Sequence, residues 1–140
     1  MHRELASHKV NGLNEALKIE VLDDPGIGNG CHHYHITTVE TPPPIGGWMQ
    51  PGDLQKAEDM LRVVTDIRFQ KGPIQEVGIN GISNESLLAI VEDRLACFQT
   101  GQFACHENML ALRRLRECMT WLKKRTMRRM QRGVEGTHKV

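Results

Sequence analysis

The longest regular pattern of apolar and polar residues is helical and runs from Cys105 to Arg132. Its apolar residues recur at steps of three and four, which places them on one face of a helix about 40 Å long at about 1.5 Å per residue. These residues are Leu112, Leu115, Met119 and Leu122. A second helical pattern begins after Ser83, a residue type that caps helices, and ends at Gly101. Its apolar residues are Leu87, Leu88, Val91, Leu95 and Phe98. Because the connection between the two is short, they predict an antiparallel helical hairpin.

The first half of the chain has the alternating pattern of strands instead. The predicted strands are Leu17–Val21, Tyr34–Glu40, Leu61–Gln70 and Ile74–Val77, with helix as a competing prediction for the third. Met1–Glu15 is weakly patterned and predicts a lead-in or a short helical turn. Prolines and glycines in Thr41–Gly52 predict an exposed loop around Trp48, and Asp53–Asp59 predicts a short helical turn.

These patterns predict an α+β protein in which a small antiparallel sheet precedes a long antiparallel two-helix hairpin. We assign residues 1–79 to the β-rich region and 80–140 to the hairpin, packed together as one compact unit. The apolar face of the longer helix is too long for the shorter helix to cover. We therefore expect a homo-oligomer, with a symmetric dimer as its simplest form.

The charged residues are unevenly distributed along the chain, which adds a candidate binding surface to the predicted fold. The net charge is +1, but residues 113–140 hold ten basic and two acidic residues, whereas residues 1–112 hold eight and fifteen. The last third of the longer helix is a cationic tip formed by Lys123, Lys124, Arg125, Arg128, Arg129 and Arg132. Cations one helical turn apart repel each other weakly. Acidic groups of the chain or an anionic ligand can compensate, and the sequence leaves both alternatives open.

The most metal-like stretch is Cys31–His35, since imidazole and thiolate groups bind zinc. On a strand, only His33 and His35 of its three histidines point the same way, which leaves His32 on the other face. No second pair of ligands follows at a suitable spacing, so we favour surface or structural histidines and expect no metal and no cofactor. The four cysteines form no CxxC pair and predict reduced thiols in the cytoplasm.

Motifs for catalysis and membrane insertion are lacking. The sequence has no nucleophile elbow, no HExxH and no glycine-rich phosphate loop ahead of a helix. Met1–Val10 is polar rather than a signal peptide, and no apolar run approaches membrane-spanning length. We therefore expect no enzyme, no catalytic residues and no membrane partner.

The cationic tip suggests binding instead. Guanidinium groups one turn apart on a rigid helix can hold two phosphates, and Phe98 or Trp121 can stack a base. Core packing is the competing interpretation for each aromatic residue. The same tip can also bind a nucleic-acid backbone, which is the main alternative function.

Several segments together resemble one known family, the first type of the phage Thoeris anti-defence sponges. The similarity spans residues 69–138, and the segments that carry it are Phe69–Gly81, Asn84–Leu95, Phe98–Gln99, Phe103–Cys105, Asn108, Trp121–Thr126 and Arg132–Thr137. The resemblance implies a non-enzymatic protein of the infected bacterial cytoplasm. Such a protein binds a cyclic ADP-ribose isomer made by TIR-domain enzymes, with glycocyclic ADP-ribose as first choice, and blocks Thoeris immunity by holding the signal intact.

The resemblance also implies partners and residues. It implies dimers or hexamers, which can hold cyclic trinucleotides at a separate site, and no stable nucleic-acid partner. Phe98 matches a ligand-stacking aromatic residue, Asn108 a hydrogen-bonding amide, and Arg125 and Arg129 the arginines that hold the diphosphate. A nucleic-acid-binding protein and an enzyme that degrades the same signal remain the alternatives. The roles of His32, His33, His35 and Trp48 stay unassigned.

Overall fold

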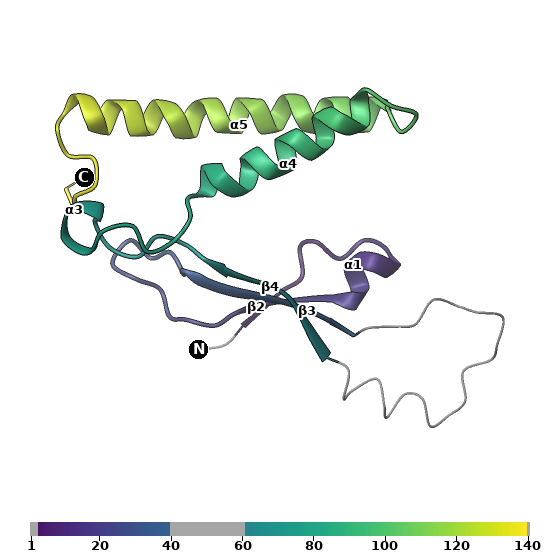
Figure 1. Ribbon diagram of the computed structural model, residues 1–140, viewed down its shortest axis with the longest axis horizontal. Coiled ribbons are helices and arrows are strands. Elements are labelled where there is room, and N and C mark those ends of the chain that lie inside the picture. Colours follow the sequence, from purple (N-terminus) through teal and green to yellow (C-terminus); the bar gives the residue numbers. More distant parts are fainter. Residues whose placement is uncertain (1–2, 40–60, 140) are drawn as a thin grey trace. The chain divides into compact units, whose positions relative to one another are not determined.

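The computed structural model describes residues 3–39 and 61–139 of the chain (Figure 1). The chain divides into two compact units, Met1–Arg68 and Phe69–Val140. The first unit contains the sheet and the second contains the helical hairpin, which confirms the α+β class. The division follows Arg68, earlier in the chain than the expected boundary at 79/80.

The first unit is a four-stranded antiparallel sheet with the strand order β1-β2-β3-β4. The strands are β1 (Arg3–Leu5), β2 (Leu17–Val21), β3 (His33–Val39) and β4 (Leu61–Arg68). Ile19 pairs with Ile36, and Tyr34 lies between Val21 and Ile67, so one face of the sheet is apolar. Val21 on this face is fully buried. The strands predicted from alternation at Leu17–Val21, Tyr34–Glu40 and Leu61–Gln70 are confirmed to within about two residues.

Two predictions for short segments need correction. Ile74–Val77 is not a strand but the one-turn helix α3. Pro73 fixes the backbone ahead of this turn, and Gly78 ends it at φ 70°, with its N–H donating to the Ile74 carbonyl. The fourth strand of the sheet is β1, which lies within the segment predicted as a lead-in, followed by the short helix α1 (Gly12–Ala16). The predicted Trp48 loop and the Asp53–Asp59 turn lie outside the described residues.

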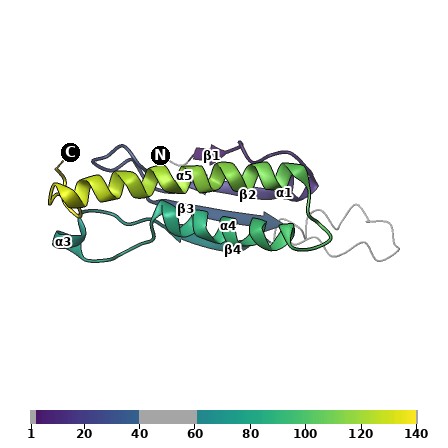
Figure 2. The ribbon, with the colours of Figure 1, turned by 90° about the horizontal axis from the view of Figure 1, so that it is seen from above.

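The second unit is built around the predicted hairpin. Its helices are α4 (Asn84–Gln99) and α5 (His106–Gln131), which pack side by side (Figure 2). Ser83 caps α4 as predicted, and Cys105 caps α5. Leu112 and Met119 of the predicted stripe are buried on α5. On α4 the stripe is less regular than predicted, because Val91 is 47% exposed whereas Glu92 is half-buried and pairs with Arg116 at 2.9 Å.

Gly81 allows the segment before α4 to lie against the start of the unit. The Gln70 N–H donates to the Ile82 carbonyl at 2.9 Å, and a Cβ on Gly81 would clash with the backbone of Phe69 and Gln70. We expect Gly81→Ala to destabilise the unit by about 1–3 kcal/mol, the range for overpacking. Thermal melts should show this loss, with Gly101→Ala as the control because its Cβ would meet nothing within 4 Å. Equal melting temperatures for the two variants would contradict this account of Gly81.

Candidate functional site

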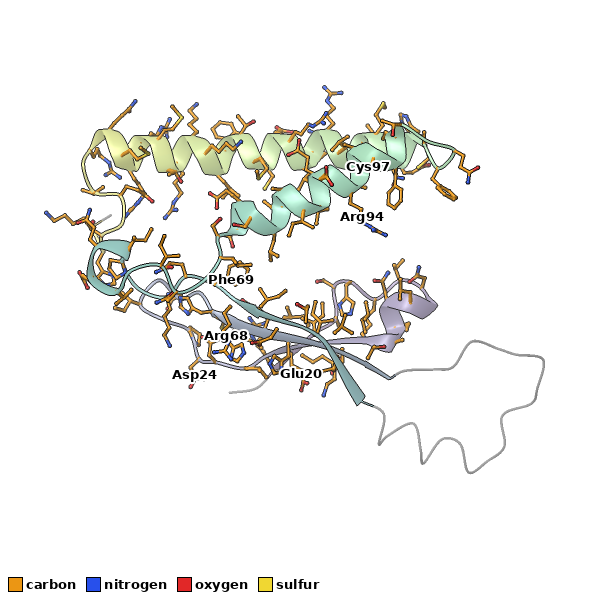
Figure 3. All side chains as sticks on the ribbon, in the orientation of Figure 1. Glu20, Asp24, Arg68, Phe69, Arg94 and Cys97 are labelled. Atoms are coloured by element: carbon orange, nitrogen blue, oxygen red, sulfur yellow. The ribbon has the colours of Figure 1, made fainter. Side chains whose placement is uncertain are left out.

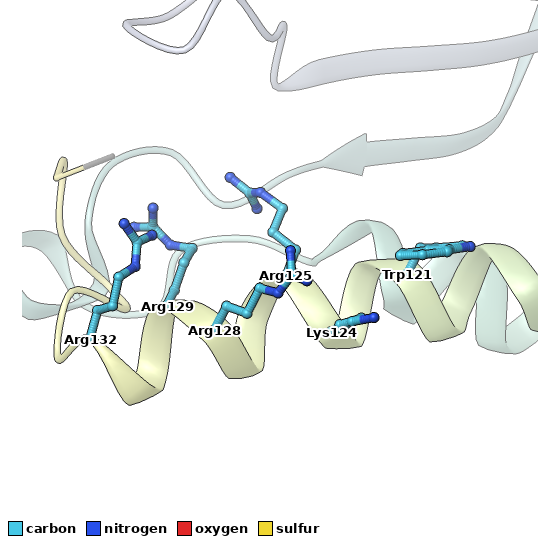
Figure 4. A pocket seen from close by; sticks show the side chains of 6 residues that line it. All are labelled: Trp121, Lys124, Arg125, Arg128, Arg129 and Arg132. Carbon is cyan, nitrogen blue, oxygen red and sulfur yellow. The ribbon is translucent and has the colours of Figure 1, made fainter.

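An open groove of about 330 Å³ lies along the basic end of α5 (Figure 4). Its lining residues come from that helix and from the cap residue that follows it, and they are Trp121, Lys124, Arg125, Arg128, Arg129 and Arg132. The Trp121 indole is 60% exposed, with the Lys124 ammonium 4.8 Å from its ring centroid. A groove with five cations and one exposed aromatic ring suits an anionic ligand that contains a base.

Arg129 faces inward and is already bound to the chain. Its side chain is only 15% exposed, and its Nε donates to Glu135 Oε2 at 2.8 Å. Its two terminal nitrogens donate to the carbonyls of Lys139 at 2.8 Å and of Val134 and Thr137 at 3.0 Å. Four of its five N–H donors are therefore used within the protein. The tail after α5 is folded around this guanidinium, so acidic and carbonyl groups of the chain neutralise part of the cationic tip.

Arg125 and Arg128 differ from Arg129 in their exposure and in their side-chain partners. Both are exposed, and neither forms an ion pair or a hydrogen bond from its side chain within the described ranges 3–39 and 61–139. Their guanidinium groups retain their donors for a ligand. From the sequence, Arg128 was predicted only as one cation of the tip, since helical spacing does not show which arginine the tail binds.

Phe98 and Asn108 lie at the other end of the hairpin. Phe98 is half-buried and packs edge-on against Phe103, with ring centroids 6.5 Å apart. The Arg94 guanidinium, on a side chain labelled in Figure 3, lies 4.9 Å from the Phe98 centroid. Asn108 is half-buried in the first turn of α5, and its backbone N–H donates to Cys105 Sγ. The Phe98 ring thus has both a packing partner and a cation near it.

The four predicted site residues form two groups in one chain. Asn108 and Arg125 lie on the same straight helix, which separates them by about 26 Å at about 1.5 Å per residue. A small ligand cannot span that distance. Within a single protomer the structure therefore does not bring Phe98 and Asn108 together with Arg125 and Arg129.

A second polar cluster lies on the sheet and consists of His33, His35 and Asp66. Asp66 Oδ1 lies 2.6 Å from His33 Nε2 and 2.7 Å from His35 Nε2, and Oδ2 accepts from Arg68 Nε at 2.9 Å. The hydrogen bonds from Arg68 and then His33 lower the pKa of Asp66 to about 2. This histidine cluster is the group of described residues that can hold a metal ion. Asp66 was not among the residues predicted from the sequence, because only the register that pairs it with His35 places it in the cluster.

Comparison with known proteins shows which family part of this chain resembles. A family model described as "Acb2/Tad1, hairpin domain" matches residues 61–127, which contain β4, α3, α4 and most of α5. Residues 61–127 of the chain are therefore similar to the Acb2/Tad1 hairpin domain. A curated relative named "Thoeris anti-defense 1", from Bacillus phage SBSphiJ7, is 48% identical over 81 residues. The match covers 58% of this chain and 57% of that protein, so the chain spans little more than half of the relative's length.

The Acb2/Tad1 match divides the candidate residues. Phe98, Asn108 and Arg125 lie inside the matched range, whereas Arg129 and the tail that it binds lie beyond residue 127. The family resemblance expected from the sequence is confirmed. Among the described residues, no helix is both long and apolar enough to cross a membrane.

Proposed function

We propose that this protein is an anti-defence sponge, which binds a TIR-produced cyclic ADP-ribose signal without cleaving it and so blocks Thoeris immunity in the infected cell. Glycocyclic ADP-ribose is the first-choice ligand. The proposal is supported by homology to a phage protein named for Thoeris anti-defence and by the cationic groove on α5. The groove is the single observation that carries it, because it offers guanidinium groups for a diphosphate beside an exposed indole.

The arginines differ in what they offer this ligand. We assign the diphosphate first to Arg125, whose guanidinium is free of protein partners among the described residues and can bind two phosphate oxygens as a fork. Arg129 contributes its charge and its one remaining N–H donor, while its other donors hold the tail. Phe98 stacks the base and Asn108 hydrogen-bonds to the ligand.

The separation of these residues requires a second copy of the chain. In an antiparallel pair of α5 helices, Phe98 and Asn108 of one protomer meet the arginines of its partner. Leu110 and Trp121 support this arrangement, since they are 41% and 60% exposed and lie on either side of the helix midpoint. They are eleven positions apart, which is close to three full helical turns, so they share one helix face. We therefore propose a homodimer as the binding unit, which can assemble further into hexamers with a separate site for cyclic trinucleotides.

Calorimetry against cyclic ADP-ribose isomers and cyclic trinucleotides tests the function directly. We expect saturable binding of one ADP-ribose isomer and a sedimentation mass above the 15.9 kDa of one chain. Heat denaturation should then release the ligand with its mass and chromatographic behaviour unchanged. A cleaved product would instead identify an enzyme that degrades the signal, and a monomer that binds tightly would contradict the two-chain site.

A nucleic-acid backbone is the second candidate ligand, because the exposed cations of the tip extend over two helical turns. Salt dependence separates the two candidates, since each neutralised phosphate of a nucleic acid adds to the slope of log affinity against log salt. We expect a shallow slope for the cyclic ligand, in line with its two phosphates, and weak, steeply salt-dependent binding to DNA or RNA. Tight nucleic-acid binding at about 0.15 M salt, where surface charges are screened beyond about 8 Å, would favour the alternative.

A further inference from the structure

The histidine cluster on the sheet is independent of the groove and of the proposed function. His33 and His35 are alternate residues of β3, and Asp66 lies opposite His35 on β4. Both Nε2 atoms lie close to the same carboxylate oxygen, at 2.6 and 2.7 Å, and the two rings are nearly perpendicular with centroids 5.1 Å apart. All three ligand atoms lie within 4.8 Å of one another.

The surrounding contacts hold this arrangement in place. Arg68 Nε binds the second oxygen of Asp66 at 2.9 Å, which leaves Oδ1 facing the two rings (Arg68 is labelled in Figure 3). The Asp23 carboxylate accepts the backbone N–H groups of His32 and His33 at 3.0 Å and so fixes the start of β3. Partners that orient the ligating side chains are a regular feature of metal sites in proteins.

We propose that His33, His35 and Asp66 form a binding site for a divalent transition-metal ion, with zinc as the first choice. The ligands are the two Nε2 atoms and Asp66 Oδ1, a set of two imidazoles and one carboxylate that leaves a position open to water. Side-chain exposures of 27%, 30% and 36% leave the cluster accessible to an ion from solvent.

Metal binding changes the tautomer of the imidazole rings and the distances between the ligand atoms. Without metal, His33 Nε2 donates to the ionised Asp66 Oδ1, and His35 Nε2 lies 2.7 Å from the same oxygen. With metal, each neutral ring carries its proton on Nδ1, and the ion occupies the position between the three ligands. Zinc bonds of about 2.0–2.1 Å place tetrahedral ligands about 3.3 Å apart, so Asp66 Oδ1 needs to move less than about 1 Å away from each Nε2 atom, and all ligand atoms start within 4.8 Å of one another. The ion then links β3 to β4 across residues that are 31 positions apart in the sequence, which favours the folded sheet.

Zinc titration of the full-length chain by calorimetry tests the site. We expect one zinc ion per chain and a melting temperature that rises with zinc concentration. His35→Ala and Asp66→Asn should each weaken zinc binding at least tenfold and abolish the zinc-dependent rise. His138→Ala is the matched control, because His138 lies near Glu76 in the second unit, and it should change neither. Zinc binding that is as tight in His35→Ala as in the wild type would overturn the proposal.

Two measurements on the wild-type protein test the metal site without relying on variants that can fold poorly. Zinc should shift the imidazole C–H signals of His33 and His35 in NMR spectra before those of the other histidines. Cobalt should give visible bands without the near-ultraviolet thiolate band that cysteine ligands produce. A thiolate band, or an earlier shift of other histidines, would assign the metal to different residues and refute the site.

Discussion

Arg129→Ala is expected to release the C-terminal tail and to destabilise the second unit by about 2–4 kcal/mol. The substitution removes four hydrogen bonds from a side chain that is 15% exposed, one of them to the Glu135 carboxylate. Hydrogen bonds that involve a charged group such as this guanidinium contribute about 1.5–3 kcal/mol each, but the contributions are not additive when they share one side chain. Three tail carbonyls and one carboxylate also lose the hydrogen bond from this guanidinium together, although the Val134 carbonyl still accepts from Thr137.

Two measurements should report this loss. The melting temperature should fall, and amide hydrogen exchange of Gly133–Lys139 should accelerate, because the tail can unfold locally while the hairpin persists. Arg129→Lys should recover only part of the stability, since an ammonium keeps the charge but cannot reach four acceptors in a planar array. Arg125→Ala is the matched control, because it removes an arginine of the same groove that has no partner among the described residues, and it should leave both readouts near the wild type. Unchanged exchange in Arg129→Ala would contradict the structural role of this residue.

The second large effect is expected in ligand binding by mixed oligomers, and it depends on the proposed two-chain site. Arg125→Ala and Phe98→Ala should each weaken binding of the cyclic ADP-ribose ligand, the former by about 10- to 150-fold if one charge-assisted hydrogen bond is lost. Arg113→Ala controls for the loss of a positive charge, because Arg113 is an exposed arginine of α5 outside the groove. We expect it to bind nearly as the wild type does.

Co-assembly of the two weak variants should restore tight binding at half of the sites. In a mixed dimer, one site combines the intact Phe98 of one protomer with the intact Arg125 of the other, and the second site lacks both. Calorimetry of the purified mixed dimer should therefore give the wild-type affinity with half the wild-type stoichiometry. A mixed dimer without any tight site would place all ligand contacts within one chain. Phe98 also packs against Phe103, so the melting temperature of Phe98→Ala must be measured to separate lost folding from lost binding.

Local patterns in the sequence determined most of the elements. The three-and-four spacing on α5, the Ser83 cap and the alternation in β2, β3 and β4 each involve residues within a few positions of one another. Such patterns report which face of an element is apolar, and this is why they predicted the hairpin and three of the four strands. They failed for Ile74–Val77, where four residues fit either period and the flanking Pro73 and Gly78 made the segment a helical turn.

The chemistry of the candidate sites was decided by tertiary structure. Helical spacing does not distinguish Arg125 from Arg129. The chain folds back after α5 and places three carbonyls and Glu135 around Arg129 and not around Arg125. Likewise His33 and His35 are neighbours on one strand, whereas Asp66 joins them only through the register of β3 against β4. Periodicity carries no information about such contacts, because they depend on the path of the backbone between residues distant in sequence. The sequence by itself determined that cations and histidines would share faces, and only the folded chain decided which of them are already bound to partners and which can hold a ligand.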